Sequence, residues 1–120
     1  MMDRRVQHVA SFIRKNCHRR LTLKEMADSV NLSPWWLSHL FKKHMGTSPE
    51  RYLTQVRLEK AKDLFENSFL TVKEVMREVG ISDGSYFNRR FKAAYGESPA
   101  KYRDGFAKST HSKSQTKIAD

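Results

Sequence analysis

Donor and acceptor side chains suited to reading DNA bases recur on one face of the stretch GISDGSYFNRRFKAAYGESP, residues 80–99. At a helical period, the apolar face of this stretch comprises Phe87, Phe91, Ala94 and Tyr95. The opposite face carries Ser85, Asn88, Arg89 and Lys92. Because Arg pairs with guanine and Asn with adenine in the major groove, we interpret this stretch as a recognition helix. The alternative is an ordinary surface helix whose charged face is only solvated.

Residues typical of helix termini border this helix. Gly80 suits the left-handed residue that ends a preceding helix. Ser82 is expected to cap the new helix with its side-chain oxygen, and Gly96 is expected to stop it after Tyr95.

An internal repeat indicates the architecture around the helix. LTLKEMADSVNLS (Leu21–Ser33) aligns with LTVKEVMREVGIS (Leu70–Ser82) at an offset of 49. One extra residue in the second turn makes the offset 50, so that FKKHMGTSPERY (Phe41–Tyr52) aligns with FKAAYGESPAKY (Phe91–Tyr102). The duplication predicts two tandem helix-turn-helix units.

The first copy contains the same local signals as the second. Thr22 and Glu25 form one expected capping box, and Thr71 and Glu74 form the other. A short helix over about 23–30 ends where Asn31 takes a left-handed turn, and Ser33-Pro34 then starts a second helix. Its inward residues are expected to be Leu37, Leu40, Phe41 and Met45, and its outward residues Trp35, Ser38, His39 and Lys42.

These segments predict an all-α fold of about seven helices, in which a long linker helix joins two helix-turn-helix subdomains. A supporting helix is expected over about 3–16, and a short last helix after Ser98-Pro99, containing Tyr102 and Phe106. We expect a first unit over 1–48, a linker helix over 49–66 and a second unit over 67–106, followed by a flexible basic tail, 107–120. Each unit is small, so one shared hydrophobic core is expected.

Composition favours a polyanionic partner, because 23 Lys and Arg against 13 Asp and Glu give a formal charge of +10. An acidic membrane surface is the other such partner, although no apolar run is long enough for a signal peptide or a membrane span. Cys17 is the only cysteine, so the chain has no internal disulfide, and the bacterial cytoplasm is the expected compartment.

The repeated residues resemble the DNA-binding domain of the AraC/XylS transcription regulators over about 6–106. The most specific part is Ser85-Tyr86-Phe87-Asn88-Arg89, followed by Phe91-Lys92, Gly96, Ser98-Pro99 and Tyr102-Arg103. The first unit shows Phe41-Lys42, Gly46, Ser48 and Tyr52, and the linker shows the Arg57, Ala61 and Leu64 spacing. The resemblance implies seven helices, with the third and sixth in successive major-groove segments, and activation of transcription through contact with RNA polymerase.

Carried over to matching positions, base contacts are implied for Trp35, Ser38 and His39 and for Ser85, Tyr86 and Arg89, and the face analysis adds Asn88. Phosphate contacts are expected from Thr22, Lys42, Lys43, Thr71, Arg90 and Lys92. Because the two reading helices differ in sequence, one molecule should prefer an asymmetric site of about 20 base pairs.

The chain also departs from the family pattern. His39 stands where many members have Arg, Met76 where a small Ala is usual, and Ile81 where Phe is common. Gly84 is a poor helix former in the first turn of the reading helix. No sensory domain is present, which is expected either of a small stand-alone regulator or of the output domain of a longer chain.

Three other functions are weighed against a sequence-specific regulator. A nonspecific or architectural DNA-binding protein would share the charge but not the base readout. A protein-interaction module would use Trp35, Trp36 and Tyr86 as anchors. An enzyme is the remotest option, since no nucleophile motif, zinc spacing or phosphate-binding glycine loop is found, and no cofactor is expected.

Overall fold

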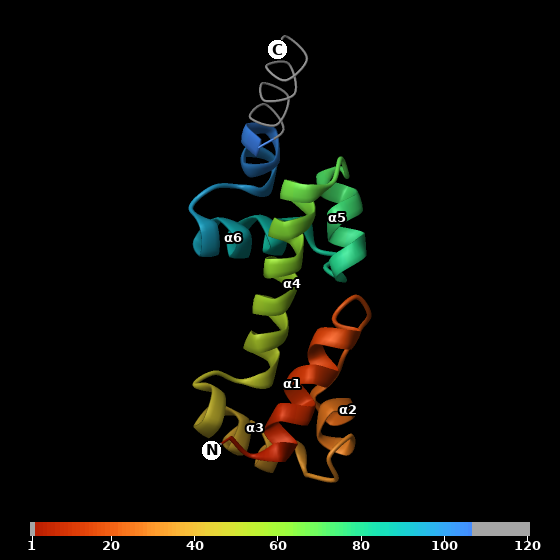
Figure 1. The fold of residues 1–120 in the computed structure, drawn as a ribbon, viewed down its shortest axis with the longest axis vertical. Helices are drawn as coiled ribbons and strands as arrows, with labels where there is room; N and C mark the ends of the chain where they lie inside the picture. Colours follow the sequence, from red (N-terminus) through yellow and green to blue (C-terminus); the bar gives the residue numbers. More distant parts are fainter. Residues whose placement is uncertain (1, 107–120) are drawn as a thin grey trace, which may run out of the picture. The chain divides into compact units, whose positions relative to one another are not determined.

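The computed structural model describes residues 2–106, and within that range the chain forms seven helices and no strand (Figure 1). The helices are α1 (Arg4–Asn16), α2 (Leu23–Asp28), α3 (Pro34–Met45), α4 (Pro49–Asn67), α5 (Val72–Val79) and α6 (Gly84–Tyr95), followed by helical residues 99–106. The predicted all-α class is confirmed. No helix in this part of the chain is long and apolar enough to cross a membrane. The predicted basic tail, 107–120, lies outside the described residues.

The chain divides into two compact units, the first ending at Arg57 and the second beginning at Leu58. Each unit has its own hydrophobic cluster, so the expectation of one shared core is wrong. The reason lies in α4, which supplies apolar side chains to both clusters. Tyr52, Leu53 and Val56 belong to the first cluster, and Leu58, Ala61 and Phe65 belong to the second.

In the first unit, α1, α2 and α3 pack on one another and on the first half of α4 (Figure 1). The first cluster includes fully buried Val6, Val9 and Ile13 from α1 and Leu37 and Phe41 from α3. In the second unit, Val75 and Val79 of α5 and Phe87 and Phe91 of α6 are buried with the second half of α4. Both recognition helices are therefore held by an apolar stripe that leaves the opposite face exposed.

The repeat seen in the sequence is also present in the packing. The Phe41 and Tyr52 rings meet edge to face with their centroids 5.5 Å apart and their planes at 64°. The equivalent rings fifty residues later, Phe91 and Tyr102, have the same centroid distance of 5.5 Å and an angle of 67°. An edge-to-face contact adds to the stability that burial alone provides, so the same ring pair anchors each recognition helix in its unit.

Helix ends in both units follow the expected turn chemistry. Gly46 and Gly96, with φ of 78° and 83°, end α3 and α6 in the left-handed region. Among the described residues, Asn31 is the only residue other than glycine with a left-handed backbone, with φ of 58°. Ser33, Ser48 and Ser98 each accept a hydrogen bond from the amide three residues later, at 3.1–3.2 Å.

The cap of α6 is Asp83 rather than the expected Ser82. The Asp83 carboxylate accepts a hydrogen bond from the amide of Tyr86 at 3.1 Å, and the helix starts at Gly84. The repeat explains the error, because Asp83 lies fifty residues after the first-unit cap, Ser33. The inserted residue therefore precedes the cap, and a carboxylate there is further favoured by the positive end of the helix dipole.

Of the two predicted capping boxes, only the second is complete. The Thr71 hydroxyl accepts from the Glu74 amide, and the Thr71 amide donates to Glu74 Oε1 at 2.9 Å. The Thr22 hydroxyl likewise accepts from the Glu25 amide at 3.1 Å. The carboxylate of Glu25, however, pairs with Arg19, with 2.9 Å between Glu25 Oε2 and Arg19 Nη1. A charged guanidinium is a stronger donor than a backbone amide, so the ion pair replaces half of the box.

One residue assigned to the apolar face of α6 is misplaced. Ala94 is exposed, whereas Phe87 and Phe91 are buried and Tyr95 is half-buried. The buried stripe follows steps of four residues from Phe87 to Tyr95, and a methyl group at its edge is too short to reach the cluster.

Candidate nucleic-acid interface

The outward face of α3 is the first candidate surface. Trp35, His39 and Lys42 are exposed, and Ser38 is half-buried beside them. The inward residues Leu37 and Phe41 are fully buried, while Leu40 and Met45 pack at the edge of the first cluster. The helix therefore presents the four predicted residues on the side away from its core.

Three aromatic rings form a continuous surface along the first turns of α3. Trp35 stacks on Trp36 with centroids 5.9 Å apart, and it also contacts the ring of His39, with a centroid distance of 3.9 Å. Trp35 is 63% exposed and Trp36 is 45% exposed, so neither tryptophan is a core residue. Exposed stacked rings offer flat apolar area to sugars and thymine methyl groups.

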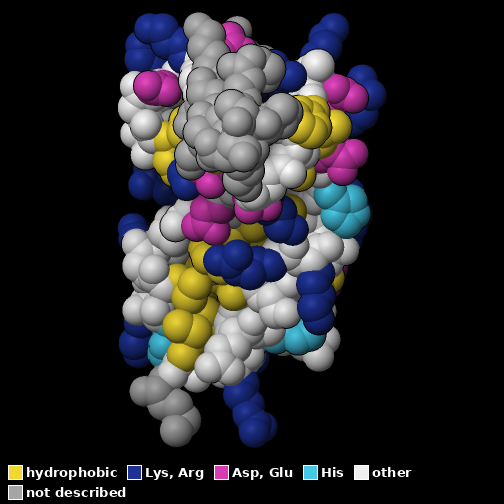
Figure 2. Space-filling view, turned by 45° about the horizontal axis from the view of Figure 1, so that its top comes forward, with side chains coloured by type: hydrophobic (Ala, Val, Ile, Leu, Met, Phe, Trp, Pro, Cys, Tyr) yellow, Lys and Arg dark blue, Asp and Glu magenta, His cyan; other side chains and the backbone are white. Residues whose placement is uncertain are grey.

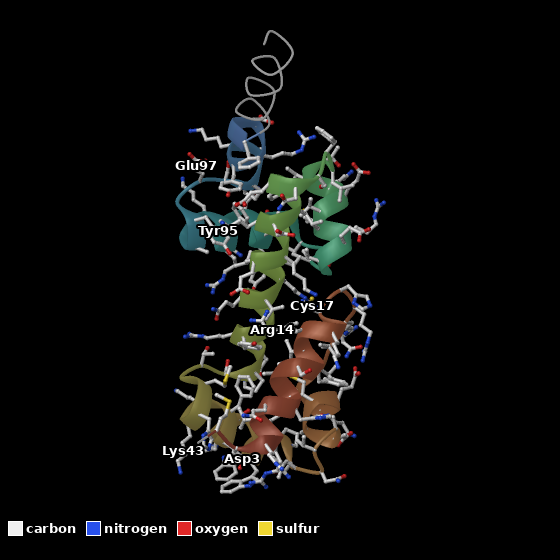
Figure 3. All side chains as sticks on the ribbon, in the orientation of Figure 1. Asp3, Arg14, Cys17, Lys43, Tyr95 and Glu97 are labelled. Carbon is white, nitrogen blue, oxygen red and sulfur yellow. The ribbon has the colours of Figure 1, made fainter. Side chains whose placement is uncertain are left out.

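A basic hollow of about 410 Å³ lies beside this aromatic surface. Its lining residues are Ser38, His39, Lys42, Lys43 and Ser48. Lys43 extends away from α3 (Figure 3). Two ammonium groups and two hydroxyls without an acidic residue in the lining are suited to binding a phosphate group. Ser48, at the start of α4, belongs to the family pattern in the sequence, but its place in this lining was not predicted.

The outward face of α6 is the second candidate surface. Ser85, Asn88, Arg89, Arg90 and Lys92 are all exposed. Within residues 2–106, the three cationic side chains of this face take part in no ion pair. Unpaired cations above a buried aromatic stripe are available to phosphates and base edges.

Tyr86 differs from the other predicted readout residues because it is half-buried. Its side chain packs against the second hydrophobic cluster. Part of the ring is therefore used in holding α6, and only the remaining part can face a ligand. The α6 terminus also carries the Asp83 carboxylate, an acceptor that sequence analysis missed as a cap.

The two threonines predicted to bind phosphate already serve as helix caps. Each hydroxyl oxygen accepts a backbone amide, and each first helical turn contains a glutamate. At α5, hydrogen bonds from Thr71, the backbone amide first, lower the pKa of Glu74. A carboxylate held ionised at a helix start repels a phosphate, so Lys42, Lys43, Arg90 and Lys92 are the stronger candidates for backbone contacts.

Basic side chains are not confined to one patch. In the face drawn in Figure 2, Lys and Arg side chains are interspersed with apolar and acidic ones. The net charge of +10 favours general attraction to a polyanion but does not by itself single out one face of the molecule.

Comparisons with known proteins agree with this arrangement. Residues 26–105 match the model of a helix-turn-helix domain family. The lactose operon transcription activator of Staphylococcus xylosus is 33% identical over 102 residues, which are 85% of this chain and 37% of that protein. The chain thus spans little more than a third of the length of this curated relative.

Solved structures show the same fold. The C-terminal domain of AraT, a response regulator from Geobacillus stearothermophilus, is 34% identical with a TM-score of 0.81, and 87% of each chain is covered. The DNA-binding domain of the global transcriptional factor AdpA, solved with a target DNA, has a TM-score of 0.81 at 23% identity, covering 87% of this chain and 94% of that one. With the family match, the repeat and the two exposed helix faces taken together, the chain belongs to the AraC/XylS family of helix-turn-helix DNA-binding regulators.

Proposed function

We propose that this chain is a sequence-specific double-stranded DNA-binding transcription regulator whose α3 and α6 enter adjacent major-groove segments. The observation that carries the proposal is the exposed face of α6, with Ser85, Asn88 and Arg89 above buried Phe87 and Phe91. Its cationic side chains form no ion pair with any residue from 2 to 106. Membership of the family supports it, as does the fold shared with a domain solved on its target DNA.

In this proposal, base readout and phosphate binding are divided among different side chains. Arg89 forms a bidentate hydrogen bond with guanine through its guanidinium, and Asn88 hydrogen-bonds adenine. Trp35, Ser38 and His39 read the first half of the site, and Ser85 and the exposed part of Tyr86 assist in the second half. Lys42, Lys43, Arg90 and Lys92 bind phosphates, with hydroxyl contacts from Thr22 and Thr71, and set the register.

The biological role is proposed by analogy with the relatives. The Staphylococcus xylosus relative is named as a transcription activator. We infer that this chain likewise activates transcription, in the bacterial cytoplasm and through contact with RNA polymerase. The activity proposed is binding rather than catalysis.

The division of roles predicts different behaviour for two variants. Arg89→Ala should lower affinity for the preferred site by about 1–3 kcal/mol and relax the preference at one base pair. Lys42→Ala should weaken every sequence about equally and reduce the slope of log K against log salt by about 1. The measurement is titration of matched and singly mismatched duplexes at fixed salt, after selection of the site from random DNA.

The rival, an architectural DNA-binding protein, predicts a different result. Its affinity would fall steeply with salt, but selection from random DNA would enrich no motif. Equal losses for Arg89→Ala on all duplexes would reject Arg89 as a readout residue. Circular dichroism of both variants checks that the helices are intact.

A further inference from the structure

The side chain of His39 is held in one orientation on the surface of α3. Its ring lies 3.9 Å from the Trp35 ring, centroid to centroid, with the planes tilted by 34°. Its Nδ1 is 3.1 Å from the carbonyl oxygen of Trp35, one helical turn earlier. A close ring contact and a hydrogen bond together restrict both torsions of an otherwise exposed side chain.

The hydrogen bond decides where the neutral ring carries its proton. A carbonyl oxygen only accepts, so Nδ1 must be the donor in this contact. The neutral imidazole has one proton on its two nitrogens, and the partner of one nitrogen sets the role of the other. With Nδ1 protonated, Nε2 is left as a hydrogen-bond acceptor.

This tautomer determines which base edge His39 can bind. Guanine presents only acceptors, O6 and N7, in the major groove, whereas adenine and cytosine present exocyclic amino groups. We propose that His39 reads an exocyclic amino group, adenine N6 or cytosine N4, through Nε2. The proposal deepens the proposed function, on which it rests, and assigns the first unit a chemical preference opposite to that of Arg89.

Basic and hydroxyl side chains surround the exposed edge of His39. The hollow beside it is lined by Lys42 and Lys43 from the same helix and by Ser48 from the start of α4. No carboxylate is among these lining residues. The same lysines bind the DNA backbone in the proposed function, which places His39 between a phosphate and the base edges.

The first experiment is made on the protein without DNA. A long-range ¹H–¹⁵N spectrum at about pH 8, where an ordinary imidazole is neutral, distinguishes the two tautomers. His39→Ala identifies the signal, and His44, on the same helix without a hydrogen bond from its ring among the described residues, is the internal comparison. Protonated Nδ1 at His39 is expected. Protonated Nε2 would overturn the proposal even if the protein binds DNA as proposed.

The second experiment removes single atoms from the DNA. The contacted base pair is the one at which wild-type preference disappears in His39→Ala. Replacing its adenine by purine, or its cytosine by 2-pyrimidinone, deletes the amino group. The loss expected for the wild type is about three- to tenfold, the value of one hydrogen bond, with no further loss for His39→Ala.

Two results would contradict the assignment. A preference for guanine at that pair, abolished by 7-deazaguanine, would show that Nε2 donates. Equal losses in wild type and His39→Ala would show that another residue binds the amino group. If no duplex is preferred at all, the proposed function itself fails. The tautomer of His39 is still tested independently, because it is measured on the free protein.

Discussion

Equivalent residues of the two repeats differ in their hydrogen bonds. The Tyr52 hydroxyl accepts from Arg14 Nε at 2.8 Å, whereas the Tyr102 hydroxyl donates to the Glu66 carboxylate. Glu66 also pairs with Lys62, at 2.9 Å. Hydrogen bonds from Tyr102 and then Lys62 lower the pKa of Glu66 below its usual value. The same tyrosine position therefore has a pH-dependent partner in one unit and a permanently charged one in the other.

This difference predicts a pH-dependent effect of Tyr102→Phe. Because the pKa of Glu66 is lowered in the folded state, its contribution to stability is present above the unfolded pKa and lost as pH falls through the folded one. Tyr102→Phe should therefore cost about 1 kcal/mol near neutral pH and progressively less in acid. Urea unfolding at a series of pH values measures the free energy of unfolding.

Tyr52→Phe is the matched control at the equivalent position. Its partner is a guanidinium that stays charged, so the gap between this variant and wild type should persist over the same acid range. The interpretation is wrong if the cost of Tyr102→Phe does not change with pH, or if the pKa of Glu66, followed by NMR, does not rise in that variant.

At the scale of the element, α6 combines a strong cap with a weak first residue. Asp83 caps the helix, but Gly84 follows as its first residue. A Cβ built on Gly84 would meet only the Met76 Cε, at 3.9 Å, which is an ordinary contact. Neither backbone conformation nor space requires glycine there, whereas Gly96 at the other end has φ of 83°.

Alanine substitutions at the two ends of α6 should therefore have opposite effects. Gly84→Ala should stabilise the protein by up to about 1 kcal/mol, because alanine has the higher helix propensity. Gly96→Ala should destabilise it by about 1–2 kcal/mol, because a left-handed residue with a Cβ is strained. Urea unfolding measures the free energy of unfolding of each variant. A lower stability for Gly84→Ala would show that the first turn of α6 needs its glycine.

At the scale of the whole molecule, two clusters rather than one hold the fold. Phe41 and Phe91 are equivalent in the repeat, and each is fully buried in the cluster of its own unit. Separate clusters allow each unit to open with its own free energy, although α4 belongs to both.

A cavity in one cluster should therefore affect mainly the unit that contains it. Phe41→Ala should destabilise the first unit by about 3–5 kcal/mol, and Phe91→Ala should do the same to the second. Amide hydrogen exchange followed residue by residue is the measurement. Faster exchange should be confined to residues before 58 in one variant and after 57 in the other, and uniform acceleration in both would contradict the division.

Much of this molecule could be predicted from local signals. The repeat and the helical periods predicted the order of the helices and the buried faces of α3 and α6. The glycine and serine signals predicted most helix ends, because each acts on backbone groups within three or four residues. The exposed side of α6 followed from the same period, since Phe87 and Phe91 must face inward.

Competition between partners more than one helical turn apart was decided only by the tertiary structure. Arg19 takes the carboxylate of Glu25 from its capping box, and Tyr86 is drawn toward the second cluster. α4 divides its apolar side chains between two clusters along its length, and the sequence pattern does not say which neighbours each half receives. Sequence by itself determined what each segment forms and which face it buries, since those depend on near neighbours. Tertiary structure decided which of several possible partners each side chain contacts, because that choice depends on residues brought together by folding.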